Sequence, residues 1–426
     1  MMIIGLGLFV VLLFVGAPVF VALTASGIFL ATTALDLPLS TLAQQFYVSM
    51  DSFILMAVPY FILSGNILLN CGPSRYLFRF LESLVGHLPG GMAAAAVLAC
   101  MIFGALSGSG IATVVAIGSI AIPEMLRLGY SKPASMGLIT CSGTLGQMIP
   151  PSIYMVLFAS LVQGDVATYF LAGVLPGIFI GTLLLIMAVY MAHRAGMRTK
   201  SAASWQERKD SFLQAFPVLL MPLVVLGGIY GGIFTPTEAA AVAIVYSLLI
   251  SRLVYRTLTW QNFVKSARDA MVGTAVIFII LGGATLLATT LTYLKLPQLL
   301  ITSVTEMGLS PLMLLFAIVL LFFVLGTVMD AVPILFITIP ILLPVLRMAQ
   351  IDLVHFNVIT VAAMMVAQVT PPFGMALFAM AGVFREPVGM VVRGSLPYLA
   401  VLMFATLVII LFPGLSLFLP NLMAGR

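Results

Sequence analysis

Long apolar stretches separated by short polar segments run along the whole chain. A helix needs about 20 apolar residues to cross about 30 Å of hydrocarbon, and lipid cannot satisfy free backbone groups, so each long stretch is expected to be helical. The pattern predicts membrane-spanning helices at roughly 51–70, 133–160, 168–193, 211–232, 235–251, 271–291, 354–383 and 394–418. The first 35 residues break at Gly16-Ala17-Pro18 and fit either one kinked span or two short helices, which leaves the side of Met1 open.

Two further apolar stretches, 91–126 and 309–346, are interrupted near their middles, at 107–110 and at 326–330. Each arm has about 16 residues and reaches only about 24 Å as a helix, which is less than the hydrocarbon thickness. Both stretches are therefore predicted to be re-entrant helical hairpins that enter and leave the membrane on the same side.

The distribution of basic residues supports this topology. If 91–126 crossed the membrane once, the strongly basic loop 194–209 would lie outside, against the preference of Lys and Arg for the cytoplasmic side. Segment 259–268, with Trp260 and basic residues, is expected to form an amphipathic helix on the inner surface. The loops expected inside hold 15 of the 18 Lys and Arg residues, and they are 71–90, 127–132, 194–209, 252–268 and 385–393.

An internal repeat relates the two halves of the chain. Three proline landmarks and a rare intramembrane Gln recur at one offset, which favours duplication over chance matching of abundant Leu and Ala. The equivalent loops at Lys132 and Asp352 are predicted on opposite sides, so the halves are inverted, as in many secondary transporters. A shift of 221 residues aligns Pro123 with Pro344, Gln147 with Gln368, Pro150-Pro151 with Pro371-Pro372, Gly173 with Gly394, and Leu175-Pro176 with Leu396-Pro397.

Composition agrees with a multi-pass membrane protein. Of the 426 residues, 62% are hydrophobic and 7% are charged, whereas soluble domains average about 25% charged. The net charge is +5, but the basic residues lie in short loops between apolar stretches, so they indicate membrane topology rather than a nucleic-acid partner. The first apolar segment is too long for a cleavable signal. Cys71, Cys100 and Cys141 lack disulfide or metal-site spacing and are expected to serve as small apolar side chains.

Polar and proline residues interrupt the apolar stretches at four repeat-equivalent places, 107–110, 142–152, 326–330 and 368–374. A break frees carbonyls at the end of one half-helix and amides at the start of the next. Carbonyl and hydroxyl oxygens suit a hard cation such as Na⁺, and amide ends suit a carboxylate. The competing interpretation is close helix packing by small residues, but four equivalent breaks favour a binding site.

Asp330 is the one acid in the middle of an apolar run, which predicts either a cation ligand or proton carrier, or an N-cap for the second arm of its hairpin. Glu238 completes the capping box Thr235-Pro236-Thr237-Glu238 and is assigned a structural role. The histidines lie in or near predicted loops and are expected to be solvated; they are His87, His193 and His355.

Catalytic chemistry is not expected. No GxxxxGK[ST] motif is present for a nucleotide-driven pump. No His is placed within a span to activate Ser107 or Ser142 as a protease nucleophile. The sequence therefore predicts a transporter that is not an enzyme and uses no cofactor beyond a coupling ion.

The order of these parts resembles the large membrane subunit of tripartite ATP-independent periplasmic (TRAP) transporters over essentially the whole chain, most specifically at 104–110, 142–151 and 370–374. The resemblance implies an all-α, inverted-repeat elevator fold in the bacterial inner membrane. It also implies Na⁺-coupled uptake of a carboxylate, such as a C4-dicarboxylate or sialic acid. The implied partners are a soluble periplasmic binding protein and a separate small four-helix membrane subunit. The implied division has scaffold segments at 1–90 and 194–308 and transport repeats at 91–193 and 309–418.

The resemblance also assigns residues to sites. No Arg lies deep in a span, so carboxylate recognition would depend on helix amino ends and on Ser, Thr and Gln side chains. The substrate is expected between the hairpin tips, with ligands among Ser109, Gln147, Pro150, Ser152, Gln368, Pro371 and Gly374. The cation sites fall on Ser107, Gly108, Ser109, Gly110, Ser142, Thr144, Gly326, Thr327, Asp330, Gln368 and Thr370.

Two other functions stay open from the sequence. One is a self-sufficient sodium symporter or a cation/proton antiporter, in which Asp330 would carry the coupling proton. The other is a passive channel or a structural membrane scaffold. The identity of the carboxylate, the Na⁺ stoichiometry and the oligomeric state are left open as well.

Overall fold

The computed structural model describes all residues except 198, 424 and 426, and the described chain is built from helices without strands. The first part contains α1 (Met2–Phe14), α2 (Val19–Ala34), α3 (Leu39–Met50), the 3-10 turn η1 (Ile54–Met56), α4 (Ala57–Cys71), α5 (Ser74–Val85), α6 (Gly91–Ser107), α7 (Gly110–Arg127), α8 (Lys132–Gly143), the 3-10 turn η2 (Thr144–Gln147), α9 (Ile153–Val162) and α10 (Val166–Arg194). The second part contains α11 (Trp205–Tyr230), α12 (Pro236–Leu249), the π-turn η3 (Ile250–Val254), α13 (Trp260–Tyr293), α14 (Leu296–Glu306), α15 (Pro311–Gly326), α16 (Ala331–Met348), α17 (Leu353–Ala367), α18 (Met375–Phe384), α19 (Val388–Leu411) and α20 (Gly414–Met423).

Eight helical segments of the described chain are long and apolar enough to cross a membrane. The predicted spans at 168–193, 211–232 and 235–251 are each found as one helix, α10, α11 and α12. The opening segment is two short helices, α1 and α2, because Gly16 takes a left-handed φ of +87° and Pro18 precedes α2. The chain is therefore a multi-pass membrane protein, as its hydropathy predicts.

Three details of the predicted elements are wrong. Segment 259–268 is not a separate helix, because α13 continues from Trp260 without a break for 34 residues. The segment 394–418 is interrupted, since Pro413 has no amide hydrogen to continue α19 and a new helix starts at Gly414. The loop 71–90 contains α5, which is amphipathic and buries Leu77, Phe78 and Leu81.

The histidine prediction holds for His193, which is exposed, and fails for His355. His355 is only 4% exposed, and its Nδ1 lies 3.2 Å from Oγ of Ser416. Sequence position near a polar loop did not show that α20 folds back over this part of α17.

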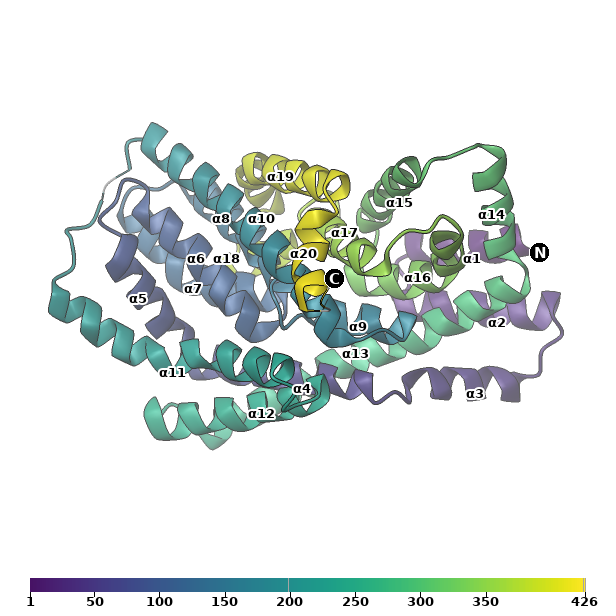
Figure 1. Cartoon of the computed structure of the whole chain (residues 1–426), viewed down its shortest axis with the longest axis horizontal. Coiled ribbons are helices and arrows are strands. Elements are labelled where there is room, and N and C mark those ends of the chain that lie inside the picture. Colours follow the sequence, from purple (N-terminus) through teal and green to yellow (C-terminus); the bar gives the residue numbers. More distant parts are fainter. Residues whose placement is uncertain (198, 424, 426) are drawn as a thin grey trace.

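Helical hairpins from the two halves lie at opposite ends of the molecule (Figure 1). The α6–α7 hairpin is followed by the interrupted helix α8–η2–α9 and then by α10; the α15–α16 hairpin is followed by α17, a break, α18 and then α19. The order of parts is thus the same in both halves. Helix α17 is predominantly apolar and is buried from His355 to Ala367, which is typical of a helix in the centre of a bundle.

The first interrupted helix packs backbone to backbone against α19. A Cβ atom at Gly137 of α8 would overlap the carbonyl group of Gly394 in α19, and a Cβ atom at Gly394 would overlap the carbonyl oxygen of Pro133. Small residues allow helices to approach this closely in membrane proteins. The contact joins the first half of the chain to the second.

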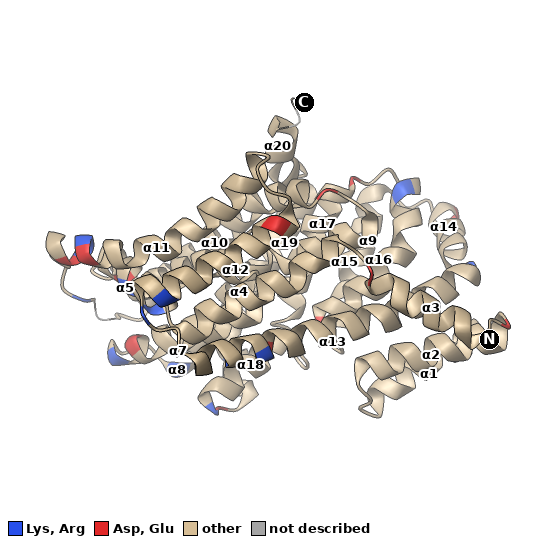
Figure 2. Cartoon of the chain, turned by 90° about the horizontal axis from the view of Figure 1, so that it is seen from below, with Lys and Arg blue, Asp and Glu red and all other residues tan. Residues whose placement is uncertain are grey.

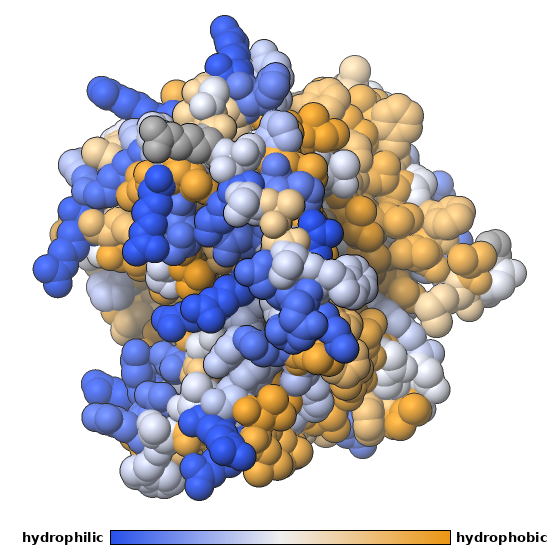
Figure 3. Space-filling view, turned by 90° about the vertical axis from the view of Figure 1, so that its left-hand side faces the viewer, coloured by the Kyte–Doolittle hydropathy of each residue, from blue (hydrophilic) through white to orange (hydrophobic). Residues whose placement is uncertain are grey.

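Lys and Arg residues gather at one end of the molecule, which we call the basic end (Figure 2), and the same end presents a largely hydrophilic surface (Figure 3). It carries α5, the α7–α8 turn and the start of α11. Lys132 at the start of α8 pairs with Glu386 between α18 and α19, and Arg127 pairs with Glu124 at 2.8 Å. By the positive-inside rule, this end is expected to face the cytoplasm.

Candidate functional site

The tip of the first hairpin is a compact cluster of oxygen atoms. Gly108 takes a φ of +62°, which favours glycine, and this turn lets Ser109 cap α7 by accepting a hydrogen bond from the amide of Ala112 at 3.4 Å. The hydroxyl of Thr113 donates to the carbonyl oxygen of Ser109 at 2.8 Å and lies 3.1 Å from Oγ of Ser107. Three hydroxyl or carbonyl oxygens thus meet within hydrogen-bond distance of one another.

The break between α8 and α9 is buried except for Ile149, which is partly exposed, and two of its polar atoms lack hydrogen-bond partners. Ser152 caps α9 by accepting from the amide of Met155, and its hydroxyl donates to the carbonyl oxygen of Gln147. Oγ of Ser142 and Oε1 of Gln147 have no hydrogen-bond partner in the described chain. Buried polar atoms without partners are costly, so these two oxygens are candidates to hold a ligand.

The structure brings this first tip and this first break together. The amide of Ile153 donates to the carbonyl oxygen of Gly108 at 3.3 Å. A Cβ atom at Gly146 would lie 2.8 Å from the carbonyl oxygen of Ser109 and equally close to Oγ1 of Thr113. The glycine therefore lets the two chain breaks meet without an intervening side chain.

The second hairpin tip differs chemically from the first. Asp330 occupies the N-cap position of α16, but its side chain makes no capping hydrogen bond there. Instead, its Oδ1 accepts a hydrogen bond from Nε2 of Gln368 at 3.1 Å. The side chain of Asp330 therefore does not cap α16, which was one of the two roles that the sequence allowed. By contrast, Glu238 makes the predicted capping box with Thr235.

The break between α17 and α18 is less enclosed than its equivalent in the first half. Gly374 N donates to the carbonyl oxygen of Thr370 at 3.1 Å, and the hydroxyl of Thr370 is engaged with the carbonyl oxygen of Val366. Pro371, Pro372 and Phe373 are exposed, and Phe373 has 57% of its surface accessible. The hydroxyl of Thr327 likewise turns back to the carbonyl oxygen of Val324. Both proline pairs, Pro150-Pro151 and Pro371-Pro372, contain a cis peptide bond.

Gln368 joins the two halves at the centre of the molecule. Its Oε1 accepts a hydrogen bond from Nε2 of Gln147, and its Nε2 donates to the hydroxyl of Tyr154 at 3.0 Å and to Asp330. Gln368 is 3% exposed and Gln147 is fully buried, so water does not replace these partners. The side chain of Gln368 thereby fixes Tyr154 from the first half next to Asp330 from the second.

A cavity of about 400 Å³ opens beside this network. Ser107 and Ser109 from the first hairpin tip and Asp330 from the second line it, so both tips border the same cavity. Of the residues expected near substrate, only Ser109 lines it; the others do not, and they are Gln147, Pro150, Ser152, Gln368, Pro371 and Gly374. The remaining lining residues come from α4, α7, α9, α13 and α16, and they are Ile62, Gly65, Asn66, Leu69, Ile111, Ala112, Val115, Tyr154, Asp269, Gly273, Ile277 and Val332.

Sequence reasoning missed four polar residues of this site. Tyr154 and Asp269 line the cavity, as does Asn66, and Thr113 completes the oxygen cluster. A signal was available for two of them, since Thr113 lies one turn after Ser109 and Asn66 is a polar residue within the apolar span 51–70. Asp269 gave no such signal, because it lies between the segment 259–268, which was expected on the membrane surface, and the predicted span 271–291.

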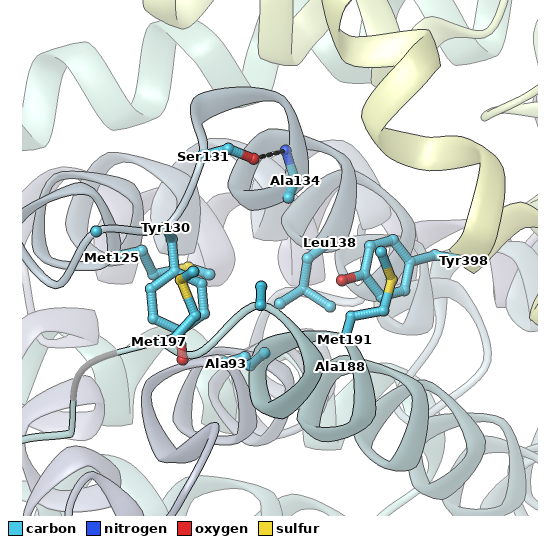
Figure 4. Close-up of a pocket in the computed structure, with 13 residues that line it drawn as sticks. Ala93, Met125, Tyr130, Ser131, Ala134, Leu138, Ala188, Met191, Met197 and Tyr398 are labelled. Atoms are coloured by element: carbon cyan, nitrogen blue, oxygen red, sulfur yellow. Dashed lines mark hydrogen bonds between the residues drawn. The ribbon is translucent and has the colours of Figure 1, made fainter.

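A second cavity, of about 250 Å³, lies near the basic end and is chemically different (Figure 4). Its lining is mainly Ala, Leu and Met side chains, and the hydroxyl of Ser131 is used to cap the amide of Ala134. Burial raises the pKa of the Tyr130 phenol, so this group stays neutral. The cavity at the hairpin tips, with its carboxylate, hydroxyls and unpartnered oxygens nearby, is therefore the better candidate for a polar or ionic ligand. In the described chain, no cluster of three His, Cys, Asp or Glu side chains could hold a metal ion.

Comparison with known proteins identifies relatives over nearly the whole chain. The model of the family described as "Tripartite ATP-independent periplasmic transporter, DctM component" matches residues 6–415. The C4-dicarboxylate TRAP transporter large permease protein DctM of Pseudomonas aeruginosa is 39% identical over 89% of each chain. The sialic acid TRAP transporter large permease protein SiaM of Vibrio cholerae is 35% identical over 97% of each chain.

Solved structures resemble this fold at low sequence identity. The crystal structure of the Alcanivorax borkumensis YdaH transporter aligns with a TM-score of 0.65 over 88% of each chain, at 13% identity. At this identity the likeness concerns the arrangement of helices, and the function must be argued from the site.

Proposed function

The chain belongs to the DctM family, the large permease subunits of TRAP transporters, and from this premise we propose that it moves a carboxylate across the inner membrane together with Na⁺. Its relatives are transporter permeases rather than enzymes. The observation that carries the proposal is the shared cavity, in which the oxygen-rich first tip faces Asp330 and Tyr154.

The first proposed Na⁺ site lies between the tip of the first hairpin and the α8–α9 break. Hard cations prefer oxygen ligands. Carbonyl and hydroxyl oxygens converge there, and Oγ of Ser142 and Oε1 of Gln147 lack other partners in the described structure. A bound Na⁺ would satisfy oxygens that otherwise carry a desolvation cost. The site draws on Ser107, Gly108, Ser109, Gly110, Ser142 and Thr144, with Thr113 added by the structure.

The second proposed Na⁺ site lies at the other hairpin tip, around Asp330. The acid supplies a charged ligand, and the freed carbonyls of the two chain breaks supply neutral ones. Gln368 holds Asp330 in place through its amide. The site draws on Gly326, Thr327, Asp330, Gln368 and Thr370.

The substrate carboxylate is proposed to bind in the cavity between these sites. The hydroxyls of Ser107, Ser109 and Tyr154 face this space, and α7 begins there with its amide groups. Amides at a helix start favour an anion. Asp330 would repel a carboxylate in the same cavity unless a cation lay between them. This repulsion provides a physical reason for coupling, because the anion binds well only after Na⁺ has neutralised the acid.

Transport is proposed to follow an elevator motion of the two repeats, 91–193 and 309–418, against the scaffold segments 1–90 and 194–308. The cavity is formed at this boundary, because α4 and α13 supply one wall and the hairpin tips supply the other. Sliding one wall along the other would change the side from which the cavity is reached. In this proposal the hairpins are re-entrant and do not cross the membrane.

The partners follow from the family, in which a large permease acts with a small membrane subunit and a periplasmic binding protein. We propose that the binding protein selects the carboxylate before delivery, since relatives of similar identity are named for C4-dicarboxylates and for sialic acid. The small subunit is proposed to be a separate four-helix chain.

Reconstitution into liposomes tests the proposal. The purified chain is combined with its small subunit and candidate binding proteins, and uptake of labelled carboxylates is followed under a Na⁺ gradient, a proton gradient or no gradient. Saturable uptake that requires Na⁺ and a binding protein is expected. Uptake driven by protons alone would support an antiporter or proton symporter, and non-saturable flux would support a channel.

A further inference from the structure

A polar cavity of about 430 Å³ lies between α5 and α7 at the basic end, separate from the proposed transport site. One wall comes from α5, one from the α7 arm of the first hairpin, and Lys200 enters from the segment between α10 and α11. The lining residues are Arg75, Phe78, Arg79, Glu82, Ser119, Ile120, Pro123, Glu124 and Lys200.

The carboxylates of this cavity are already engaged by a lysine. Lys200 pairs with Glu82 of α5 and lies 3.7 Å from Glu124 of α7, which also pairs with Arg127 at 2.8 Å. Arg75 and Arg79 are different, since neither makes an ion pair or a side-chain hydrogen bond within the described chain. Two guanidinium groups one helical turn apart therefore line this cavity without an ion pair, while its two carboxylates are engaged by Lys200 and Arg127.

The helix that carries these arginines has the character of a membrane-surface helix. It buries Leu77, Phe78 and Leu81 and presents Arg75 and Arg79 on its exposed side. Exposed leucines follow directly, at Leu84 and Leu88. A strongly amphipathic helix with basic residues at the membrane surface is typical of a binding site for anionic lipid head groups.

We propose that this cavity binds the phosphate group of an anionic phospholipid of the cytoplasmic leaflet, held by Arg75 and Arg79. A guanidinium group matches the geometry of a phosphate and forms paired, charge-assisted hydrogen bonds with it. The cavity lies at the basic end, which is expected at the cytoplasmic membrane surface, and this location favours a lipid head group over free phosphate. A lipid bound there would brace α5 against the α7 arm and so stabilise this position of the first hairpin.

Native mass spectrometry of the purified full-length chain tests this inference, with phosphatidylglycerol, phosphatidylcholine and inorganic phosphate as probes. The double variant R75Q/R79Q is compared with R252Q/R268Q, which removes two exposed arginines at the same end that do not line the cavity. At about 1 kcal/mol per basic side chain, R75Q/R79Q is expected to weaken phosphatidylglycerol binding about 10- to 30-fold. The control variant is expected to bind as the wild type does.

Three results would overturn the proposal: equal losses in both double variants, equal affinity for phosphatidylglycerol and phosphatidylcholine, or competition by inorganic phosphate at similar concentrations. The first would indicate general surface charge, and the last would indicate a site for soluble anions. R75K/R79K keeps the charge and is expected to retain most of the binding. If R75Q/R79Q does not fold, the same comparison is made with R79Q alone.

Discussion

Gln147 and Gln368 meet side chain to side chain in the buried centre of the molecule, with Nε2 of Gln147 donating to Oε1 of Gln368. Each belongs to the break in the interrupted helix of its own half. The contact thus joins the two breaks directly, and through Gln368 it extends to Tyr154 and Asp330. A substitution of Gln368 is therefore expected to disturb hydrogen bonds in both halves of the chain.

Replacing Gln368 by Ala is expected to lower Na⁺-dependent uptake by at least about tenfold, because buried groups on Gln147, Tyr154 and Asp330 lose a partner at a cost of about 1–3 kcal/mol each. Initial uptake rates in liposomes measure the effect. Gln261→Ala is the matched control, since Gln261 is exposed at the start of α13. Equal rates in the two variants would show that the amide network is not needed for transport.

Asp330→Asn is expected to weaken the Na⁺ dependence of uptake while the protein still folds. The substitution keeps an acceptor for Gln368 but removes the charge that we assign to the second Na⁺ site. Losing a charged ligand should raise the Na⁺ concentration for half-maximal uptake by at least about tenfold. Uptake measured against Na⁺ concentration tests this, with Asp36→Asn at an exposed position as the control. An unchanged Na⁺ curve would remove Asp330 from the cation site.

Tyr154→Phe is expected to raise the carboxylate concentration for half-maximal uptake by about 10- to 100-fold, as a hydrogen bond to a charged group contributes about 1.5–3 kcal/mol. The ring keeps its packing, so the melting temperature should change little. Tyr190→Phe, at a residue that is 55% exposed, is the control. If only the Na⁺ dependence changed, Tyr154 would belong to a cation site rather than to the substrate cavity.

Gly394→Ala is expected to destabilise the protein by about 1–3 kcal/mol or to prevent its folding, because overpacking forces backbone shifts. The added methyl group would overlap the carbonyl oxygen of Pro133 in α8. Gly389→Ala on the same helix meets no atom within 4 Å and should be nearly neutral. Thermal melting in detergent compares the two, and equal melting temperatures would mean that α8 and α19 separate more easily than the close contact implies.

The sequence predicted most of the long apolar helices and the common order of parts in the two halves, because both depend on local patterns; it did not predict the shorter helices α3 and α14. Apolar length predicts a span, and Pro pairs mark a break wherever they occur. The same patterns indicated Ser107, Ser109, Gln368 and Asp330 as residues to examine. They misplaced the residues whose environment is set by distant segments. His355 was expected in solvent and is covered by α20.

By itself, the sequence determined that this chain is a membrane protein with an interrupted, oxygen-rich segment in each half. Hydropathy, charge and proline spacing depend only on residues close together in the chain, so they can be assessed without knowing the tertiary structure. The tertiary structure decided which breaks meet. It placed Tyr154 beside Asp330 through Gln368, and it brought Arg75, Arg79 and Lys200 to one cavity. These groupings join residues far apart in the chain, and close packing of whole helices, rather than local preference, sets their distances.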